Sequence, residues 1–467
     1  MILSYTRRSF LLQATACGGT AYLNATKATA YEEAGNKLRI AAVGVANRGS
    51  MGIAYCSGED ITALCDVDAA NVGRAQEAFP KASRYSDYRV MLEKEQDIDA
   101  VLIAVPDHMH FPIAMAAIQL GKHVYVEKPM GWTVEEVRQL TQEAARQGVV
   151  TQMGIQGHAI EDGRRLCEMI GSGVIGAVRE VHVWTSRPDW PQGMTTPLPE
   201  EPVPPTLDWD LWLGNAPHRP YNQGYCPRRW RVWWDFGTGA LGDMGCHLLD
   251  PVHWALKLGA PLSVEVVKRE QCTEQSGPLY STLKYEFPAR GDLPPVTVYW
   301  YDGIGKGNFV PRPEGLPEDT IIGDSNDSDN GSLFVGDKGF ITAGEYGGRN
   351  PRLVPDTLME DYEYPEPTLQ RIGWMDRAHW KKWHHWDWIR ACKGGPEPGA
   401  NFNYAGPLTE TVLLGNVALR ACALGQTMQW DSENMRSQNV PEASLSSAPV
   451  HGMAKEAQDE TRRLNTT

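Results

Sequence analysis

Residues 39–49 read RIAAVGVANRG, a short apolar run that leads directly into a glycine-bounded string. A second apolar run, ITALC at 61–65, follows and ends in Asp66. Gly44 permits a tight turn after the first run, and the small residues after it let backbone N–H groups approach a phosphate at a helix N-terminus. The stretch therefore predicts a strand, a turn, a helix and a second strand, the unit that binds a dinucleotide.

The acid at the end of the second run indicates which dinucleotide is bound. Asp66 could accept hydrogen bonds from the ribose hydroxyls of the adenosine, and its charge would repel a 2′-phosphate. Ala46 replaces the middle glycine of the usual fingerprint, and Arg48 could still pair with a phosphate. NAD is therefore the expected cofactor, with NADP as the alternative.

More apolar runs follow at 98–105, 122–126 and 148–153, separated by helical stretches such as 133–147. Continuous apolar strands that alternate with helices predict a parallel sheet covered on both faces, which is a doubly wound Rossmann domain of the α/β class. Such sheets bind ligands at the carboxyl ends of their strands. The residues expected to contact the cofactor are Gly44, Ala46, Asn47, Arg48, Gly49, Asp66, Pro106, His108, His110, Glu127, Lys128 and Gln156.

No metal is expected in this chain. His108 and His110 form an H-x-H pair, but no carboxylate or cysteine lies at ligand spacing nearby, so we interpret them as cofactor-facing or capping residues. The stretch DSNDSDNG at 324–331 has Asn326 and Ser328 where a calcium loop needs carboxylates. The nine cysteines include no C-x-x-C pair, which argues against a zinc ribbon.

A second string, GTGALGDMGCHLLD at 237–250, places Asp243 and His247 four residues apart on one helix face. Oxidation of a secondary alcohol needs a base for the hydroxyl proton and a donor for the developing oxyanion. His247 is the expected base, because its unperturbed pKa lies near neutrality. Asp243 is expected to orient that imidazole or to bind a substrate hydroxyl, and Lys128 to supply a polarising ammonium. The alternative is that the helix pair is a surface ion pair without chemistry.

Taken in order, the glycine string, PDHMH at 106–110, EKP at 127–129 and GALGDMGCH resemble the Gfo/Idh/MocA family of sugar and cyclitol oxidoreductases, which includes glucose-fructose oxidoreductase and inositol dehydrogenase. The resemblance implies a Rossmann domain over 37–155 and a second α/β domain over 156–430. In this family the second domain has an open, largely antiparallel sheet that carries the substrate site and often the oligomer interface. A homo-oligomer, dimer or tetramer, is therefore expected.

The resemblance also assigns roles to two neighbouring residues. In the family the lysine that matches Lys128 shares in proton transfer, and the peptide bond before the proline that matches Pro129 is often cis. The departure at Ala46 bears on the contacts to the pyrophosphate and leaves the expected fold unchanged.

Sixteen tryptophans indicate the class of substrate. Flat indole rings could stack on a sugar ring while charged side chains bind its hydroxyls, whereas packing in the core is the alternative and is expected for many of them. The residues expected to contact a small carbohydrate are Arg187, Trp190, Arg229, Trp233, Asp243 and His247.

The N-terminus indicates export. Residues 6–12, TRRSFLL, pair two arginines with an apolar run, and small residues follow at 28–30. This pattern resembles a twin-arginine signal over 1–30 and predicts a periplasmic protein. The alternative is a lipid anchor through Cys17.

Charge and hydropathy exclude two classes of partner. The net charge of −14 leaves no basic surface for nucleic acid. No stretch after the signal is long and apolar enough to span a membrane. Beyond Trp430 the chain turns polar, which predicts a loosely ordered tail over 431–467.

An exported enzyme would find little free NAD outside the cytoplasm, so we expect it to carry a tightly held nicotinamide. The first hypothesis is an oxidoreductase that acts on a secondary alcohol of a sugar, cyclitol or glycoside and regenerates its cofactor in place. The second is a redox-neutral glycoside hydrolase or lyase that works through a transient keto-sugar. A nucleotide-binding protein without catalysis is the third, disfavoured by the presence of Lys128, Asp243 and His247.

Overall fold

The computed structural model describes residues 37–323, 329–372 and 380–443. The predicted signal over 1–30 and much of the acidic stretch at 324–331 lie outside these residues. Within the described part of the chain, no helix has the length and apolar character needed to cross a membrane.

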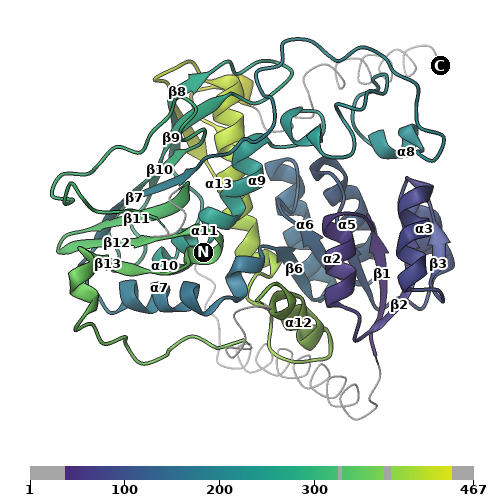
Figure 1. Ribbon diagram of the computed structural model, residues 1–467, viewed down its shortest axis with the longest axis horizontal. Helices are drawn as coiled ribbons and strands as arrows, with labels where there is room; N and C mark the ends of the chain where they lie inside the picture. Colours follow the sequence, from purple (N-terminus) through teal and green to yellow (C-terminus); the bar gives the residue numbers. More distant parts are fainter. Residues whose placement is uncertain (1–36, 324–328, 373–379, 444–467) are drawn as a thin grey trace, which may run out of the picture.

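The first domain is built on a parallel sheet of six strands (Figure 1). Its order is that of a doubly wound dinucleotide-binding fold, so the predicted fold class is confirmed. The strands, in spatial order, are β3 (Ser83–Tyr85), β2 (Asp60–Cys65), β1 (Arg39–Val43), β4 (Ala100–Ile103), β5 (His123–Glu127) and β6 (Thr151–Gly154).

Helices connect these strands and cover both faces of the sheet. The longest of them begins at a capping box formed by Thr133 and Glu136 and ends at Gly148, which adopts the left-handed conformation that stops a helix. The helices of this domain are α2 (Arg48–Tyr55), α3 (Ala69–Ala78), α4 (Tyr88–Lys94), α5 (His110–Gln119) and α6 (Val134–Gln147).

The second domain is built on a nine-stranded sheet in which β7 and β10 pair in parallel and the other neighbours pair antiparallel. The open, largely antiparallel sheet that the resemblance implied is thus present. In spatial order its strands are β13 (Arg352–Val354), β12 (Gly339–Ala343), β11 (Asn330–Gly336), β7 (Val178–Thr185), β10 (Val296–Tyr301), β9 (Tyr280–Phe287), β8 (Ser263–Glu270), β14 (Thr427–Asp431) and β15 (Arg436–Ser437).

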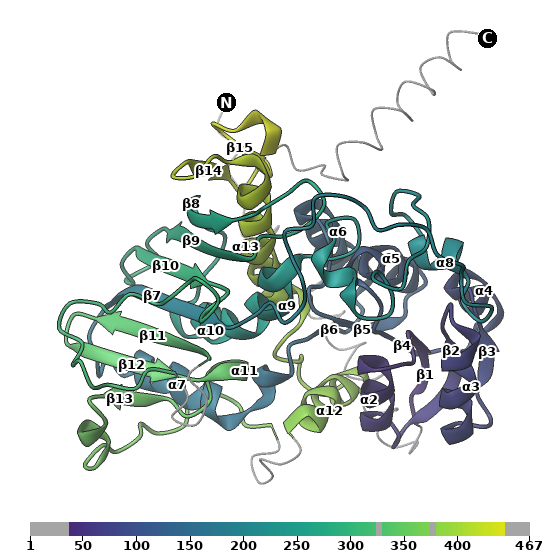
Figure 2. The same ribbon diagram turned by 45° about the horizontal axis from the view of Figure 1, so that its top comes forward.

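A long helix, α13, runs between the two sheets and joins the domains (Figures 1 and 2). Its buried Glu410 accepts hydrogen bonds from Arg138 of α6 and from the indole N–H of Trp430 on β14. The helices of this part of the chain are α7 (Glu161–Gly171), α8 (Trp209–Leu213), α9 (Gly239–Leu248), α10 (Asp250–Leu256), α11 (Glu345–Gly348), α12 (Trp380–Cys392) and α13 (Phe402–Ala421).

Two predicted domain boundaries need correction. Helix α12 lies within the range assigned to the second domain, yet Trp388 and Ile389 belong to the same apolar cluster as Leu38 of the first domain, and α12 lies beside α2 (Figure 2). The predicted tail begins too early, because β15 pairs with β14 and Val440 is buried in the main core. Local polarity did not reveal either contact, since both depend on packing against distant segments.

Residues 186–238, between β7 and α9, leave the second domain and cross to the first; we call them the crossing segment. Its Leu207 forms a β-bridge with Asp68, directly after β2, and the amide of Ala69 donates to Thr206 O at 2.8 Å. Within this segment a cluster of aromatic side chains packs around α8, which lies over the first domain in both ribbon views. The crossing segment thereby closes one side of the space in front of the parallel sheet.

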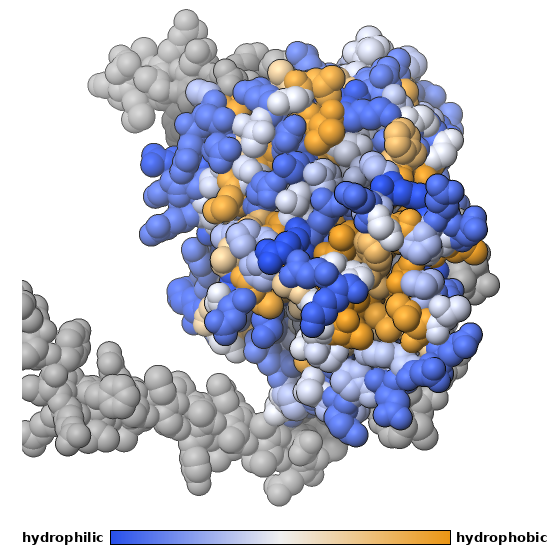
Figure 3. Space-filling view, turned by 90° about the vertical axis from the view of Figure 1, so that its left-hand side faces the viewer, coloured by the Kyte–Doolittle hydropathy of each residue, from blue (hydrophilic) through white to orange (hydrophobic). Residues whose placement is uncertain are grey.

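Apolar side chains also gather on the surface of the second domain. Figure 3 faces this side of the molecule and shows them grouped among polar residues. Exposed apolar patches are typical of protein–protein interfaces. The homo-oligomer nevertheless stays a prediction.

Candidate active site

A large cleft lies at the carboxyl ends of β1, β2, β4 and β5, bounded by α9, α11 and the crossing segment. Its volume of about 2000 Å³ exceeds the roughly 300–1,000 Å³ of a site for one small ligand. The cleft can therefore hold a dinucleotide together with a sugar.

The glycine string forms the floor of this cleft where the dinucleotide phosphates are expected. Gly44 has φ +78°, and a Cβ there would lie 2.2 Å from the carbonyl oxygen of Ala104, so only glycine fits. Ala46, Asn47 and Arg48 line the cleft, and their contact with the cofactor stays a prediction. Gly49 does not line it: a Cβ at Gly49 would meet Gly44 O at 1.8 Å, so this residue allows α2 to pack closely on the turn.

Asp66 lines the cleft at the end of β2 and is tied to the same turn. One carboxylate oxygen accepts from the amide of Val45 at 3.0 Å, and the other accepts from the amide of Asp68 at 3.0 Å and the side-chain amide of Asn71 at 3.2 Å. Burial raises the pKa of this carboxyl above its ordinary value, while these hydrogen bonds oppose the rise. Asp66 is thus held in position for the predicted contact with the ribose.

We expect Asp66→Ala to weaken NAD binding and to relax discrimination against NADP. The substitution removes both the ribose acceptor and the charge that repels a 2′-phosphate. Equilibrium binding of NAD and NADP to refolded apoprotein measures both effects. Asp66→Asn is the matched control, because it keeps an oxygen acceptor for Val45 and removes only the charge; an unchanged preference in both variants would show that Asp66 does not face the ribose.

A buried polar network lies deeper in the cleft. The guanidinium of Arg48 donates from Nε to Glu127 at 2.9 Å, and the side-chain amide of Gln156 donates to Glu127 at 3.0 Å and to the hydroxyl of Tyr125 at 2.9 Å. Arg48, Glu127 and Gln156 all line the cleft. The sequence left Arg48 open as a phosphate ligand, but the structure pairs it with Glu127.

His108 and His110 do not face the cleft, which corrects their predicted contact with the cofactor. Both imidazoles are buried, and their ring nitrogens lie against backbone carbonyls. His108 faces the carbonyls of Phe236 and Trp212 at 3.2 and 3.1 Å, and His110 faces those of Pro129 and Val105 at 2.6 and 2.9 Å. Their role is to join loops, and His108 ties the crossing segment to the first domain.

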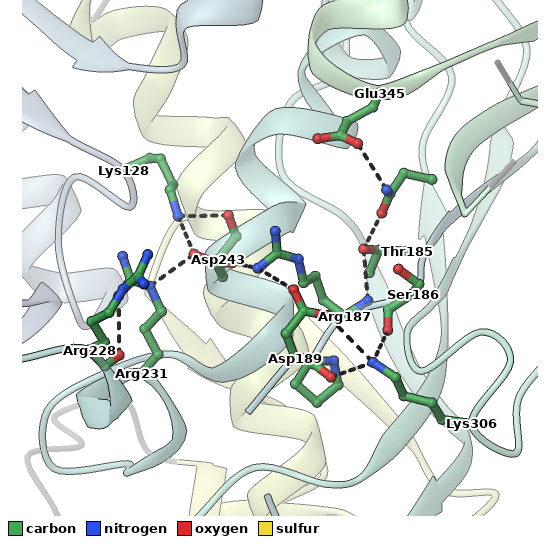
Figure 4. Close-up of polar contacts among 12 residues, drawn as sticks. Lys128, Thr185, Ser186, Arg187, Asp189, Arg228, Arg231, Asp243, Lys306 and Glu345 are labelled. Carbon is green, nitrogen blue, oxygen red and sulfur yellow. Dashed lines mark hydrogen bonds and ion pairs between the residues drawn. The ribbon is translucent and has the colours of Figure 1, made fainter. Parts of the chain in front are cut away.

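Lys128 and Asp243 meet across the domain boundary (Figure 4). The Lys128 ammonium donates to the Asp243 carboxylate at 2.9 Å and to the Asp243 carbonyl oxygen at 2.7 Å. An ammonium has three N–H donors, so one remains for a ligand in the cleft. The Lys128–Pro129 bond is cis, as the resemblance implied.

Three cations surround the Asp243 carboxylate: Lys128, Arg231 at 3.0 Å and Arg187 at 3.8 Å. Burial disfavours its ionisation, but these cations outweigh burial and hold its pKa well below the ordinary range. No hydrogen bond joins Asp243 to His247, which corrects the prediction that Asp243 orients the imidazole. Its other predicted role, binding a substrate hydroxyl, stays a prediction.

His247 lines the cleft from the same helix, α9, one turn further on. Among the described residues its Nδ1 has no hydrogen-bond partner, and the ring of Tyr346 approaches edge-on with centroids 5.0 Å apart. Burial, reinforced by the charge of Lys128, lowers the pKa of His247 well below its ordinary value. The imidazole is therefore neutral near pH 7 and able to accept a proton.

Most, but not all, of the other residues predicted to contact the substrate line the cleft. Arg187, Trp190 and Arg229 line the cleft, whereas Trp233 is buried in the aromatic cluster with its ring 5.0 Å from that of Tyr225, so its predicted substrate contact is wrong. Its packing depends on residues of the crossing segment that periodicity did not bring together. Tyr346 and Lys381 also line the cleft, and neither was expected there from the sequence.

Asp107, which follows a strand of the parallel sheet, also lines the cleft. Burial raises the pKa of its carboxyl to about 6, and its carboxylate accepts from the hydroxyl of Thr238 at 2.6 Å. Among the residues that the structure describes, no group of three or more His, Cys, Asp or Glu side chains could hold a metal ion.

Comparison with known proteins agrees with this architecture. A family model for an oxidoreductase with an NAD-binding Rossmann fold matches residues 38–155, and the model for the C-terminal alpha/beta domain of the same family matches 163–290. The chain belongs to the Gfo/Idh/MocA oxidoreductase family. NAD is therefore the cofactor of its first domain, and the cradle, Asp66 and the cleft volume fit it.

The similar proteins differ in what their descriptions say they act on. A glycosyl hydrolase family 109 protein of Saccharopolyspora erythraea is 26% identical over 395 residues, which are 79% of this chain and 72% of that protein. The WlbA dehydrogenase of Bordetella pertussis, solved with NADH and UDP-GlcNAcA, has a TM-score of 0.57 at 17% identity and covers 85% of this chain and 99% of its own. An inositol dehydrogenase homologue of Azotobacter vinelandii, solved with NADH and myo-inositol, has a TM-score of 0.54 at 17% identity, covering 85% and 98%.

Proposed function

We propose that this Gfo/Idh/MocA protein oxidises a secondary alcohol of a sugar, cyclitol or glycoside and retains its nicotinamide between turnovers. The observation that carries the proposal is the meeting of Lys128, Asp243 and a neutral His247 in one cleft with the dinucleotide cradle. Dehydrogenation of an alcohol requires these groups at one place.

The neutral and the charged side chains of the site have different roles in this reaction. The His247 imidazole accepts the hydroxyl proton, because burial keeps it neutral. The remaining N–H of Lys128 donates to the substrate oxygen as negative charge develops there, and Asp243 holds the ammonium in position. NAD, when bound, supplies the acceptor for the hydride that leaves the substrate carbon.

Retention of the cofactor is supported by the crossing segment. Backbone hydrogen bonds join Thr206 and Asp208 of this segment to the residues just after β2, next to the expected adenosine site. A dinucleotide bound there would be enclosed until this contact opens. We propose that export by the twin-arginine route to the periplasm, or anchoring through Cys17, makes such retention necessary.

A second function is favoured by the family 109 relative. In a redox-neutral cycle, removal of hydride and proton from a sugar carbinol gives a ketone, which acidifies the adjacent C–H. Loss of that proton expels the aglycone with its bonding electrons, water adds to the resulting double bond, and the hydride returns to the ketone. In this cycle too, His247 would accept the hydroxyl proton of the carbinol, and Lys128 would donate to the carbinol oxygen.

The purified, exported protein is expected to contain NAD or NADH. Mass spectrometry of denatured protein identifies the nucleotide, and a panel of sugars and glycosides then separates the two functions. Net NADH with a keto-product supports simple dehydrogenation, and aglycone release without net NADH supports the redox-neutral cycle. Absence of any nucleotide from correctly exported protein would remove the case for a retained cofactor.

A further inference from the structure

We infer that the substrate carries an anionic group, a carboxylate or a phosphate ester, which is bound by arginines of the crossing segment; this inference rests on the proposed function. Four arginines line the cleft from this segment: Arg187, Arg228, Arg229 and Arg231. We call them the arginine group. Among the carboxylates that line the cleft, Asp189 and Asp243 form ion pairs with members of this group.

Both of these carboxylates are already shared between cations. Asp243 binds Lys128, Arg231 and Arg187, and Asp189 binds Arg187 at 2.9 Å and Lys306 at 3.6 Å (Figure 4). Positive charge therefore exceeds negative charge in this part of the cleft.

Arg228 and Arg229 carry the uncompensated charge. Both are exposed, and neither forms an ion pair with any residue of the described chain. The whole chain has 58 acidic residues against 44 lysines and arginines, so a carboxylate partner would be the common case for an arginine. Two unpaired arginines at the cleft of an acidic protein indicate that their partner is a ligand.

The other two guanidiniums are fixed in orientation. Arg231 lies over the indole of Trp230 at 4.2 Å and Arg187 over that of Trp190 at 5.9 Å. Stacking does not use the N–H groups of a guanidinium. Some of these groups already bind Asp243 and Asp189, and the others are left for the oxygens of a carboxylate or phosphate. The indoles that were expected to stack on a sugar therefore serve at least in part to hold arginines.

The pyrophosphate of the cofactor is the competing anion. Its expected place is the turn at 44–49, where backbone amides and the N-terminus of α2 provide the positive potential. Arg228 lies beside Arg231 on the side of Asp243 that carries Lys128, which places it next to the expected site of chemistry (Figure 4). The structure thus favours the substrate as the source of the anion.

The test uses the NAD-containing enzyme and matched pairs of probes: p-nitrophenyl β-glucuronide against the β-glucoside, and glucose 6-phosphate against glucose. Aglycone release and the spectrum of the bound nicotinamide report turnover. We expect one anionic probe to exceed its neutral partner in kcat/KM by about tenfold or more, as charged hydrogen bonds of this kind contribute. Added salt is expected to reduce this preference.

Arg229→Gln and Arg228→Gln are expected to reduce the anionic preference by about tenfold each, mainly through KM, without loss of bound NAD. Arg229→Lys keeps the positive charge but removes the planar guanidinium, so it tests whether two parallel hydrogen bonds to the anion are needed. Arg146→Gln, on the exposed end of α6, removes the same charge elsewhere and is expected to leave the preference intact.

Two results would overturn the inference. A preference for the neutral probes, unchanged in the Arg229 and Arg228 variants, would show that no substrate anion is bound. Loss of NAD from these variants would assign the arginines to the pyrophosphate. In both cases the proposed function survives if neutral sugars are turned over, whereas the absence of any turnover or spectral change with every probe would count against the proposed function itself.

Discussion

Lys128→Ala and His247→Ala are each expected to lower turnover by about a hundredfold or more, because general acid–base groups contribute factors of that size. Lys128 is the proposed donor to the developing oxyanion, and His247 is the proposed neutral base in the same cleft. Turnover with a reactive sugar, bound NAD content and circular dichroism are measured on each purified variant. Fold and cofactor content are expected to stay nearly intact.

The Lys128→Ala, His247→Ala double variant shows whether the two residues act on the same proton or independently. If Lys128 and His247 handle the same proton, the loss in the double variant is less than the product of the single losses. Asp243→Asn is expected to cost less than either single variant, since it loosens the position of Lys128 and leaves the ammonium in place. Near-normal turnover of His247→Ala with NAD still bound would assign the helix pair a structural role.

The same geometry predicts a pH dependence. The lowered pKa of His247 keeps the base neutral below the ordinary histidine value of about 6.5, so this group imposes no loss of activity as pH falls from neutrality to that value. The loss that it does impose comes only in more acidic solution, where the imidazole takes up a proton. A pH profile of kcat/KM for the wild-type protein measures the pH at which this loss of activity occurs.

The second large effect is expected from His108→Ala. We expect it to lower the free energy of unfolding by about 3 kcal/mol, since it empties a fully buried imidazole site and removes the one hydrogen bond that the neutral ring donates to the carbonyls of Phe236 and Trp212. Because these carbonyls belong to the crossing segment, we also expect NAD to dissociate about tenfold faster. Chemical unfolding and the release of NAD during repeated dilution measure the two effects.

Glu200→Ala is the matched control for the second effect. Glu200 is exposed in the same segment and takes no part in the contacts that Thr206, Leu207 and Asp208 make with the first domain, so neither stability nor NAD release is expected to change. A His108 variant that loses stability but releases NAD at the wild-type rate would show that the crossing segment does not enclose the cofactor.

Much of the fold follows from short-range patterns. The run RIAAV, the turn at Gly44 and the acid at the end of ITALC predict a dinucleotide-binding unit, because each residue type satisfies a local requirement of backbone geometry or charge. The strands and helices of the first domain occur close to the predicted ranges for the same reason. The catalytic candidates Lys128, Asp243 and His247 share one cleft, but only Lys128 directly follows a strand of the parallel sheet; Asp243 and His247 reach the cleft from α9, so the packing of the two domains brings the three together.

Tertiary structure alone decided the partners of these side chains. His108 and His110 lie against backbone carbonyls, Asp243 binds Lys128 and Arg231 rather than His247, and Trp233 packs in a core. Each contact joins side chains to a loop or strand whose position depends on how the whole chain packs. The sequence by itself determined the elements and the chemistry that they carry, and the packing of the two domains decided which charges face each other, because charge pairing depends on distance in space rather than along the chain.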